Sequence, residues 1–444
     1  MSVISKEIFL SQLFAEFERK QLDYFVFGEY ESLPIDTGES DIDIIVSCSD
    51  THKLIQTLVA VVNKNDIKLA SFYRNSQELM FRFLTIEWGV QIDFLLGGLY
   101  YRGLSYYPLE NLKQHVVIYN SIRVLEKQYG YFVGFFKDVI HNAHAKHKYC
   151  DAILQAIQAN EFDVKQEVET CFAKDTWEII RSNASSVEAL NHSGKQIRHT
   201  ILRHRKNASL IKSLSYHVCR IGRLFQSHPG YVIVVEGTDG SGKSTIINAL
   251  NLWLSEGFHK SVIYNHLRPK LLPDIAELFG KRKSEGIVEV VSNPHMQEPS
   301  GFIGSLARWI YYLHDYTWGY LVKVLPKIRT RSFVYVFDRY YYDYYVDSVR
   351  SHLVLPYWLL RLGETFIPKP DIILCLGGNP NKIYARKPET SLDEVTRQTE
   401  ELKHFTARRK NAVWVDTTQP IENSICDAKT AILNMMSTRF KNML

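Results

Sequence analysis

One stretch of this 444-residue chain limits its fold more than any other: a strand, a glycine-rich loop and a helix start follow one another within residues 231–254. Val232 to Val235 is a continuous apolar run, which favours a buried parallel strand. Ile246 to Leu254 has helical periodicity. Between them the sequence fits G-x-x-x-x-G-K-[ST], whose glycines let backbone N–H groups converge on phosphate oxygens. The chain is therefore predicted to contain an α/β unit that binds a nucleoside triphosphate.

The loop residues have predicted roles in holding ATP and Mg²⁺, the two predicted cofactors. Lys243 is expected to reach the β- and γ-phosphates, and Ser244 to ligate Mg²⁺. The other residues expected to surround the phosphates are Gly237, Gly240, Ser241, Gly242 and Thr245.

Composition restricts the class of protein further. The net charge of +5 suits small phosphorylated substrates but falls short of the concentrated charge of a dedicated nucleic-acid binder. The 6 cysteines lack C-x-x-C spacing, so neither a zinc site nor a disulfide framework is indicated. No signal-peptide pattern or membrane-spanning apolar run is apparent. We therefore expect a cytoplasmic protein without a transmembrane segment.

Three zones differ in their sequence pattern, and we predict three units: 1–125, 126–228 and 229–444. Ser227–Gly230 is a turn-forming tetrapeptide before the last unit, and the middle unit has helical spacing and no proline until Pro229. The first unit begins with a helix expected at Lys6–Lys20. Its expected strands are Tyr24–Phe27, Ile42–Val46, Phe81–Ile86 and Val90–Leu95. The predicted fold is α/β, with a mixed sheet, a helical connector and a parallel sheet flanked by helices.

A second apolar strand in the last unit ends at Asp338-Arg339. The carboxyl ends of strands converge on the ligand crevice in an open α/β sheet, so both side chains should face the phosphates. The strand lacks the terminal Asp-Glu pair of many motor ATPases, and no Asn-Lys-x-Asp segment follows the phosphate loop. These features favour phosphoryl transfer to a small acceptor over a switch or a motor.

Glu236–Thr245 followed by Asp338–Tyr340 resembles the thymidylate kinase family of P-loop kinases. The resemblance covers about residues 229–444. Later segments are similar to the family's core strand, lid and final strand: Lys369–Leu376, Arg386–Glu389 and Val413–Asp416.

The resemblance implies a role for each matching residue. Lys243 and Arg339 would stabilise the transferring phosphoryl group, while Arg386 closes over it from the lid. Asp338 would organise Mg²⁺ or its waters, and Asp239 would contact an acceptor hydroxyl. The family further implies a dimer. Arg386 is preferred over Lys387 because its planar guanidinium matches phosphate geometry. In the alternative interpretation, both residues are solvated surface cations without a role in catalysis.

The acceptor site departs from the family pattern. Arg268 matches the arginine that grips the acceptor phosphate, but Leu267 stands in place of the family's glutamate. His314-Asp315 occupies the place of an Asp-Arg pair. Tyr340 begins an aromatic run that either contacts a base or sugar or packs a helix. Thymidine monophosphate is therefore one expected acceptor among nucleoside monophosphates.

A second set of acidic residues lies in the first unit. Alternation in a strand places Asp41 and Asp43 on one face, and Asp93 ends a neighbouring strand, so three carboxylates could hold two Mg²⁺. With Gly28 and Gly38–Asp41, this pattern resembles the polymerase-β-type nucleotidyltransferase superfamily over about residues 20–100. Glu29 occupies the place of the superfamily's serine or glycine, which leaves catalytic competence open.

We predict an ATP-dependent phosphotransferase that moves the γ-phosphate of ATP to a small, phosphorylated acceptor, with a second, nucleotidyltransferase-like unit. Two alternatives stay open. In one, an active nucleotidyltransferase of surface-glycan precursor metabolism carries a P-loop unit that binds ATP only for regulation or scaffolding. In the other, the chain is a non-enzymatic assembly protein.

Overall fold

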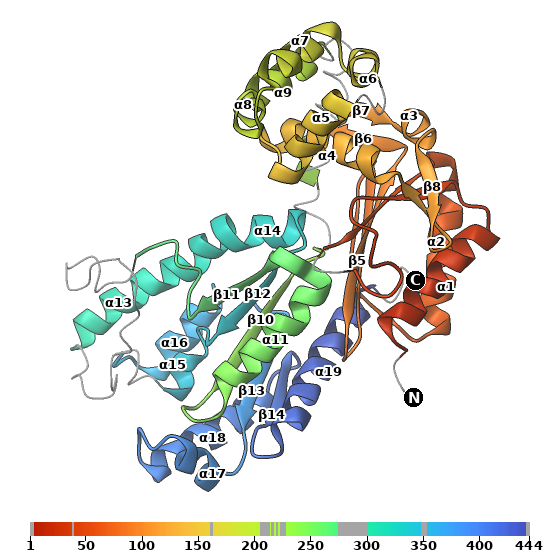
Figure 1. Cartoon of the computed structure of the whole chain (residues 1–444). Coiled ribbons are helices and arrows are strands. Elements are labelled where there is room, and N and C mark those ends of the chain that lie inside the picture. Colours follow the sequence, from red (N-terminus) through yellow and green to blue (C-terminus); the bar gives the residue numbers. More distant parts are fainter. Residues whose placement is uncertain are drawn as a thin grey trace.

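The chain forms an α/β protein with two separate large sheets (Figure 1). The structure is a computed structural model that describes residues 4–37, 40–159, 163–204, 228–273, 301–347 and 353–440, together with Leu214, His217, Val218, Ile221 and Gly222. A mixed seven-stranded sheet lies in the N-terminal part and an all-parallel five-stranded sheet in the C-terminal part, with a helical region between them. The fold class predicted from the sequence is confirmed.

The N-terminal sheet has the strand order β3-β4-β5-β2-β1-β9-β8. Its strands are β1 (Tyr24–Phe27), β2 (Ile42–Val46), β3 (Lys68–Arg74), β4 (Glu78–Leu84), β5 (Gly89–Leu96), β8 (Val116–Tyr119) and β9 (Ile122–Leu125). The other elements of this part are α1 (Lys6–Arg19), η1 (Cys48–Asp50), α2 (Thr51–Lys64), the hairpin β6 (Gly98–Tyr101) and β7 (Leu104–Pro108), and α3 (Leu109–Lys113). The parallel pairing of β2 with β5 sets Asp43 directly opposite Asp93.

The helical region covers one side of the N-terminal sheet. Its helices are α4 (Lys127–Asn142), α5 (His147–Ala159), α6 (Val164–Cys171), α7 (Lys174–Asn183), α8 (Val187–His192) and α9 (Gly194–His204). Phe132 and Phe136 of α4 share a buried cluster with Phe25 and Phe27 of β1. This region is therefore part of a packed core.

The C-terminal sheet has the order β11-β12-β10-β13-β14, and every pair in it is parallel. Its strands are β10 (Tyr231–Gly237), β11 (Val262–His266), β12 (Val334–Asp338), β13 (Ile372–Gly377) and β14 (Ala412–Asp416). The helical elements described around it are α11 (Lys243–Phe258), η4 (His259–Ser261), α13 (Phe302–His314), the π-helical η6 (Asp315–Val324), α14 (Leu325–Thr330), α15 (Asp343–Val346), α16 (Tyr357–Glu364), α17 (Pro380–Arg386), α18 (Leu392–Ala407) and α19 (Ile421–Phe440).

The two sheets meet through α11 and α19, which pack against β3, β4 and β5 (Figure 1). Apolar residues from both parts belong to one continuous buried cluster. Hydrogen bonds cross the same contact: the Trp253 indole donates to the Thr85 carbonyl over 2.7 Å, and the Ser71 hydroxyl donates to the Pro229 carbonyl over 2.8 Å. The division into units 1–125, 126–228 and 229–444 stays a prediction, because the first and last of them share this core.

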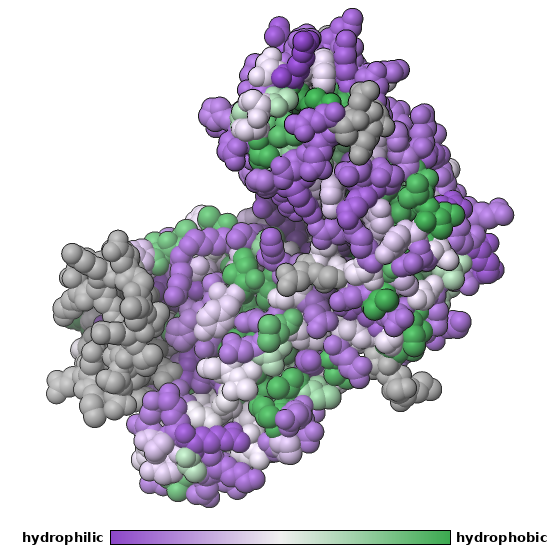
Figure 2. Space-filling model, viewed as in Figure 1, coloured by the Kyte–Doolittle hydropathy of each residue, from purple (hydrophilic) through white to green (hydrophobic). Residues whose placement is uncertain are grey.

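The face seen in Figure 2 is mostly hydrophilic in the N-terminal part, with hydrophobic residues scattered over the C-terminal part. Within the described parts of the chain, no helix has both the length and the apolar character needed to cross a membrane.

The packing of α16 on the end of α18 leads to a pH-dependent prediction. Glu364 lies 2.6 Å from Arg409 and accepts a 2.7 Å hydrogen bond from Tyr345. Burial alone would raise the pKa of Glu364, but Arg409 and Tyr345 outweigh it and lower the pKa below its usual value. A lowered carboxyl pKa stabilises the fold above the unfolded pKa and loses that effect as the pH falls through the folded pKa. We expect Glu364→Gln to lower the free energy of unfolding by about 1 kcal/mol at pH 7 and by much less near pH 3, measured by urea denaturation.

Candidate functional site

The phosphate loop joins the carboxyl end of β10 to the start of α11. Gly240 and Gly242 have φ angles of +80° and +81°, a region that side chains disfavour. A Cβ atom on Gly240 would also lie 2.7 Å from the Ile383 carbonyl oxygen, so the loop has no room for a side chain there. Ser244 and Thr245 are exposed in the first turn of α11, where unpaired N–H groups and the helix dipole favour an anion.

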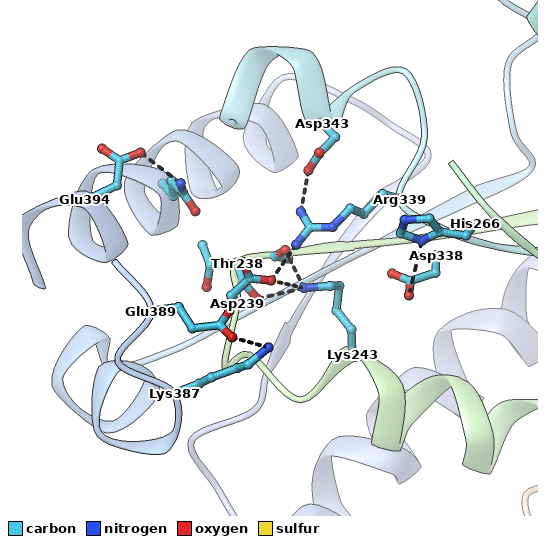
Figure 3. A network of polar contacts seen from close by, with 12 residues as sticks. Thr238, Asp239, Lys243, His266, Asp338, Arg339, Asp343, Lys387, Glu389 and Glu394 are labelled. Carbon is cyan, nitrogen blue, oxygen red and sulfur yellow. Dashed lines mark hydrogen bonds and ion pairs between the residues drawn. The ribbon is translucent and has the colours of Figure 1, made fainter. Parts of the chain in front are cut away.

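Asp239 connects the two cations expected to act on a transferring phosphoryl group (Figure 3). Its Oδ1 lies 2.9 Å from Arg339 Nη2 and 3.8 Å from Lys243 Nζ. Lys243 also donates to the Gly237 and Thr238 carbonyls over 2.8 Å. The structure therefore brings Lys243, Asp239 and Arg339 together at the carboxyl edge of the parallel sheet.

Arg339 is fixed in place from two sides. Its guanidinium is 2% exposed and spans Asp239 on the phosphate loop and Asp343, whose Oδ1 lies 2.5 Å from Nη1. The backbone of Arg339 has a φ of +67°, and an arginine pays a strain energy there of about 1–3 kcal/mol. Such strain is retained where the surrounding structure holds the residue in one orientation.

Asp338 lies at the same edge with one free oxygen. Its Oδ2 accepts a 3.2 Å hydrogen bond from Tyr264 and lies 3.7 Å from His266 Nδ1. Oδ1 is buried and has no hydrogen-bond partner among the described residues. Burial alone would raise the pKa of Asp338, but His266 and the charges of Lys243 and Arg339 outweigh it and lower the pKa. An ionised carboxylate with a free buried oxygen fits a role in holding Mg²⁺ or its waters.

Glu236 supports the site from the end of β10. Its side chain is 1% exposed, and Oε1 accepts a 2.8 Å hydrogen bond from the Tyr340 backbone N–H. Burial, with a further contribution from the Asp343 charge, raises the pKa of Glu236 well above its usual range. This contact ties the strand that leads into the phosphate loop to the segment that carries Arg339.

The lid segment lies beside the phosphate loop, but its two cations point to different partners. Arg386 is exposed and donates to the Thr417 carbonyl over 2.8 Å. Lys387 pairs with Glu389 over 3.0 Å, and Figure 3 shows this pair next to Asp239. Lys387, which the sequence analysis ranked below Arg386, thus lies near the Asp239 network, and the role of Arg386 stays a prediction.

Arg268 and Tyr340 both lie in buried surroundings. Arg268 Nη1 donates to Asp315 over 2.7 Å, and its guanidinium lies 4.5 Å from the centre of the Tyr312 ring. Asp315, which stands where the family has an Asp-Arg pair, is the acidic partner of this arginine. Tyr340 is fully buried, and its hydroxyl donates to the Pro368 carbonyl. The aromatic run that Tyr340 begins packs into the core of the C-terminal part.

The three N-terminal carboxylates converge as the sequence suggested. Ligand oxygens of Asp41, Asp43 and Asp93 all lie within 4.8 Å of one another. Burial raises the pKa of Asp43 and, with the charges of nearby carboxylates, raises the pKa of Asp93 well above its usual value. Close carboxylates repel one another unless protons or cations are present, which fits a divalent cation site.

Residues around this cluster match a phosphate-binding setting. Gly28 has a φ of +105° with open space where a side chain would be, and Lys137 pairs with Asp43 over 2.7 Å. Glu29 pairs with Lys148, so its charge has a cationic partner. A cavity of about 590 Å³ lies against the cluster, Gly28 and Lys137. Gly38 and Glu39 of the predicted motif lie outside the described residues.

Sequence reasoning missed residues that hold these sites in shape. Asp343 begins α15 and pairs with Arg339 in the turn before that helix, a contact for which the sequence gives no helical signal. Gln91 lies two residues before Asp93 and hydrogen-bonds to it over 3.0 and 3.1 Å, as strand alternation would allow. Lys137 lies on another element, and no local signal connects it to Asp43.

Fold and site define an α/β protein whose parallel sheet carries a glycine-rich loop of the G-x-x-x-x-G-K-[ST] pattern between β10 and α11. The chain is 26% identical over 171 residues to a probable thymidylate kinase of Thermococcus onnurineus (strain NA1), a match that covers 37% of this chain and 76% of that protein. It is 28% identical over 171 residues, with the same shares, to a probable thymidylate kinase of Thermococcus kodakarensis (strain ATCC BAA-918 / JCM 12380 / KOD1). No model of a known protein family matches the chain. This distant, partial similarity indicates a P-loop kinase-like domain.

Proposed function

We propose that the C-terminal part transfers the γ-phosphate of ATP to a small, phosphorylated acceptor. The observation that carries this proposal is the placement of Lys243 and Arg339 on the same Asp239 oxygen, at 3.8 and 2.9 Å. Phosphoryl transfer needs little covalent assistance, so fixed positive charge around the transferring group supplies most of the catalysis.

Each residue then has a task in the transfer. Backbone N–H groups of residues 237–245 bind the ATP phosphates, and Lys243 neutralises charge on the β- and γ-oxygens. Ser244 and Asp338 would hold Mg²⁺, which would offset the negative charge of the ATP phosphates. Arg339 stabilises the equatorial oxygens in the transition state. When ATP binds, its γ-phosphate would replace Asp239 as a partner of Lys243 and Arg339. Asp239 would then be able to orient an acceptor hydroxyl.

The lid and the acceptor side complete this proposal. Arg386 ends α17 and Lys387 follows it, and Ile383 of the same helix lies against the phosphate loop at Gly240. A small movement of this segment would exclude water from the site. Arg268 is proposed to bind the acceptor phosphate. Its guanidinium would then donate to the substrate as well as, or in place of, Asp315. Thymidine monophosphate and other nucleoside monophosphates are the first acceptors to test, because the similar proteins are named as probable thymidylate kinases.

The test is a screen of nucleoside monophosphates and sugar phosphates with ATP, Mg²⁺ and the full chain. Mass spectrometry should find one acceptor class that gains the mass of one phosphate while ADP forms in equal amount. Formation of ADP without any phosphorylated acceptor, across both classes, would contradict a kinase of this kind.

A second activity is favoured by the three converged carboxylates of the N-terminal part. We propose that Asp41, Asp43 and Asp93 bind divalent cations and transfer a nucleotidyl group from a nucleoside triphosphate to an acceptor hydroxyl. Gly28 leaves space for a triphosphate near the cluster, and Lys137 supplies positive charge. A biosynthetic pathway in which one intermediate is phosphorylated and another is nucleotidylated would use both the kinase site and the carboxylate site.

Metal binding gives a direct prediction for this second site. We expect the full chain to bind Mn²⁺, detected by the loss of its free electron paramagnetic resonance signal, and Asp41→Asn/Asp93→Asn to weaken that binding by about 100-fold, because two of three hard oxygen ligands lose their charge. Asp163→Asn/Asp175→Asn in the helical region is the matched control. Equal Mn²⁺ affinity in the two double variants would contradict a metal site at the carboxylates.

A further inference from the structure

A second cavity adjoins the N-terminal carboxylates on the side of the C-terminal part. It has a volume of about 560 Å³, and we call it the junction cavity. Asp41 and Asp93 line both this cavity and the one that contains Gly28 and Lys137, whereas Asp43 lines only the latter. The two cavities therefore meet at Asp41 and Asp93, and a bond formed there could join a ligand in one cavity to a ligand in the other.

The C-terminal part forms one wall of the junction cavity. His259, Lys260 and Ser261 come from η4 after α11, and Arg331 and Ser332 come from the turn before β12. The opposite wall is the surface of β4 and β5. Lys146, which follows α4, closes one side. Lys146, Lys260 and Glu78 line both cavities, whereas Arg331 lines only the junction cavity. The cavity is thus a composite of all three regions of the chain, and an isolated N-terminal unit would not have it.

A buried arginine fixes the two walls relative to each other. Arg82 is 2% exposed; it donates to Gln91 over 2.9 Å and to the Ser332 carbonyl over 2.8 Å, and it lies 4.7 Å from the centre of the Phe258 ring. Gln91 in turn donates to both Asp93 oxygens. A continuous set of contacts therefore runs from the candidate metal ligand Asp93 to the base of the C-terminal sheet.

The cavity also presents cationic side chains that form no ion pair with the carboxylates of the described residues. Among the described residues, no carboxylate lies within ion-pair distance of Lys146, Lys260 or Arg331, and all three side chains are exposed. The Nε2 atom of His259 is buried and has no hydrogen-bond partner among those residues. Asp41, Glu78 and Asp93 form the acidic side of the cavity, and Arg82, Lys146, Lys260 and Arg331 form its cationic side. Divalent cations at Asp41 and Asp93 would offset much of the acidic charge. The cationic groups would then exceed the acidic ones and favour an anion.

We propose that the junction cavity binds the phosphate group of the acceptor on which the N-terminal site acts, with Lys260 and Arg331 of the C-terminal part as its main contacts. This inference rests on the second proposed activity. In the reaction, the acceptor hydroxyl oxygen forms a bond to the α-phosphorus of a nucleoside triphosphate in the Gly28 cavity. The bond from that phosphorus to the bridging oxygen breaks, pyrophosphate leaves and the hydroxyl proton passes to solvent.

The junction cavity is separate from the proposed kinase site. Lys243 begins α11 and His259 follows its end, and a helix of 16 residues is about 24 Å long. The phosphate loop lies at the carboxyl edge of the parallel sheet, whereas Ser332 precedes β12 at the amino edge. One ligand cannot occupy both sites, so their affinities can be measured independently.

Equilibrium dialysis of labelled inorganic phosphate tests the proposal with the full chain and Mg²⁺. All samples carry Lys243→Ala, which weakens phosphate binding at the loop. We expect Lys260→Gln/Arg331→Gln to lower phosphate affinity about tenfold, because two charged contacts are lost. Arg181→Gln/Lys195→Gln, which removes the same charge from exposed sites in α7 and α9, should leave it unchanged. All four side chains are exposed, so the substitutions should not disturb folding.

The location of the phosphate is tested by replacing Mg²⁺ with Mn²⁺ and measuring phosphorus relaxation of bound phosphate. Strong relaxation that disappears with Lys260→Gln/Arg331→Gln supports the proposal. Unchanged phosphate affinity in that variant, or an equal loss in the control, overturns it. If Mn²⁺ does not bind but phosphate affinity still depends on Lys260 and Arg331, the nucleotidyltransferase proposal fails while the anion site stands.

Discussion

Lys243→Ala should lower phosphoryl transfer from ATP by about 10²- to 10³-fold, the usual effect of removing one fixed cationic or hydrogen-bonding group from a transition state. The Lys243 ammonium now donates to two loop carbonyls and lies 3.8 Å from Asp239, all within the phosphate loop. Alanine would leave the loop backbone able to bind phosphate while the charge on the β- and γ-oxygens is lost. The measurement is the initial rate of ADP formation with the acceptor found by the screen.

Lys195→Ala is the matched control, since this exposed lysine lies in α9, outside the C-terminal part. It should retain the wild-type rate. Wild-type ADP formation in Lys243→Ala would reject the kinase and favour a P-loop unit that only regulates or scaffolds. Absence of ATP turnover in the unmodified chain with every acceptor would favour an assembly protein.

Arg339→Met should reduce both stability and transfer. Arg339 is buried between Asp239 and Asp343, and removing it leaves two acidic groups without their cation. Loss of one partner from a buried ion pair costs about 3–5 kcal/mol. We therefore expect a decrease of that size in the free energy of unfolding, measured by urea denaturation, and a loss of transfer activity of about 100-fold or more in the folded protein.

A second substitution separates these two effects. Asp343→Asn removes one of the stranded charges, so Arg339→Met/Asp343→Asn should recover part of the stability of Arg339→Met. It should not recover transfer, because the positive charge at the γ-phosphate is still missing. Recovery of the wild-type rate in the double variant would show that Arg339 only supports the fold. The stability and the transfer rate of Arg339→Lys should lie between those of the wild type and Arg339→Met. Lysine keeps the positive charge but cannot span both carboxylates.

The parts of this fold predicted best from the sequence are those with strong local patterns. The structure gives β1 and β2 the predicted bounds, Tyr24–Phe27 and Ile42–Val46, and α1 differs from its predicted range by one residue. The predicted strand at Phe81–Ile86 begins earlier, at Glu78, since β4 pairs along its whole length with β3 and β5. Strand β3, which pairs with the following strand β4, was not predicted, because its alternation of apolar and polar residues is weak.

Contacts between distant segments could not be predicted in this way. The α11 helix shows only that one side is apolar, and nothing local reveals that β4 and β5 cover part of it. In the sequence, Arg82 is a charged residue within an apolar strand. In the structure it donates to Gln91 of β5 and to the carbonyl of Ser332 in the C-terminal part. The junction cavity depends on these long-range contacts, so it follows from the structure alone.

The acceptor side shows the same limit. Arg268 was predicted as a phosphate ligand from its place in a motif, and its buried partner Asp315 lies 47 residues away. Tyr340 follows the catalytic candidate Arg339 directly, but it lies in the turn after β12, and its ring is buried in the core of the C-terminal part. Position along the chain therefore locates a site better than it assigns a role to each of its side chains.

The central claim, that the C-terminal part moves a terminal phosphate, is tested most directly by a reaction with two differently labelled ATP samples. One carries the label in the γ-phosphate and the other in the α-phosphate, with the same acceptor, Mg²⁺ and full chain in each. We predict that the γ label appears in the acceptor and that Lys243→Ala slows this transfer by about 10²- to 10³-fold. Appearance of only the α label in the acceptor, with the γ label released in pyrophosphate, would contradict the account.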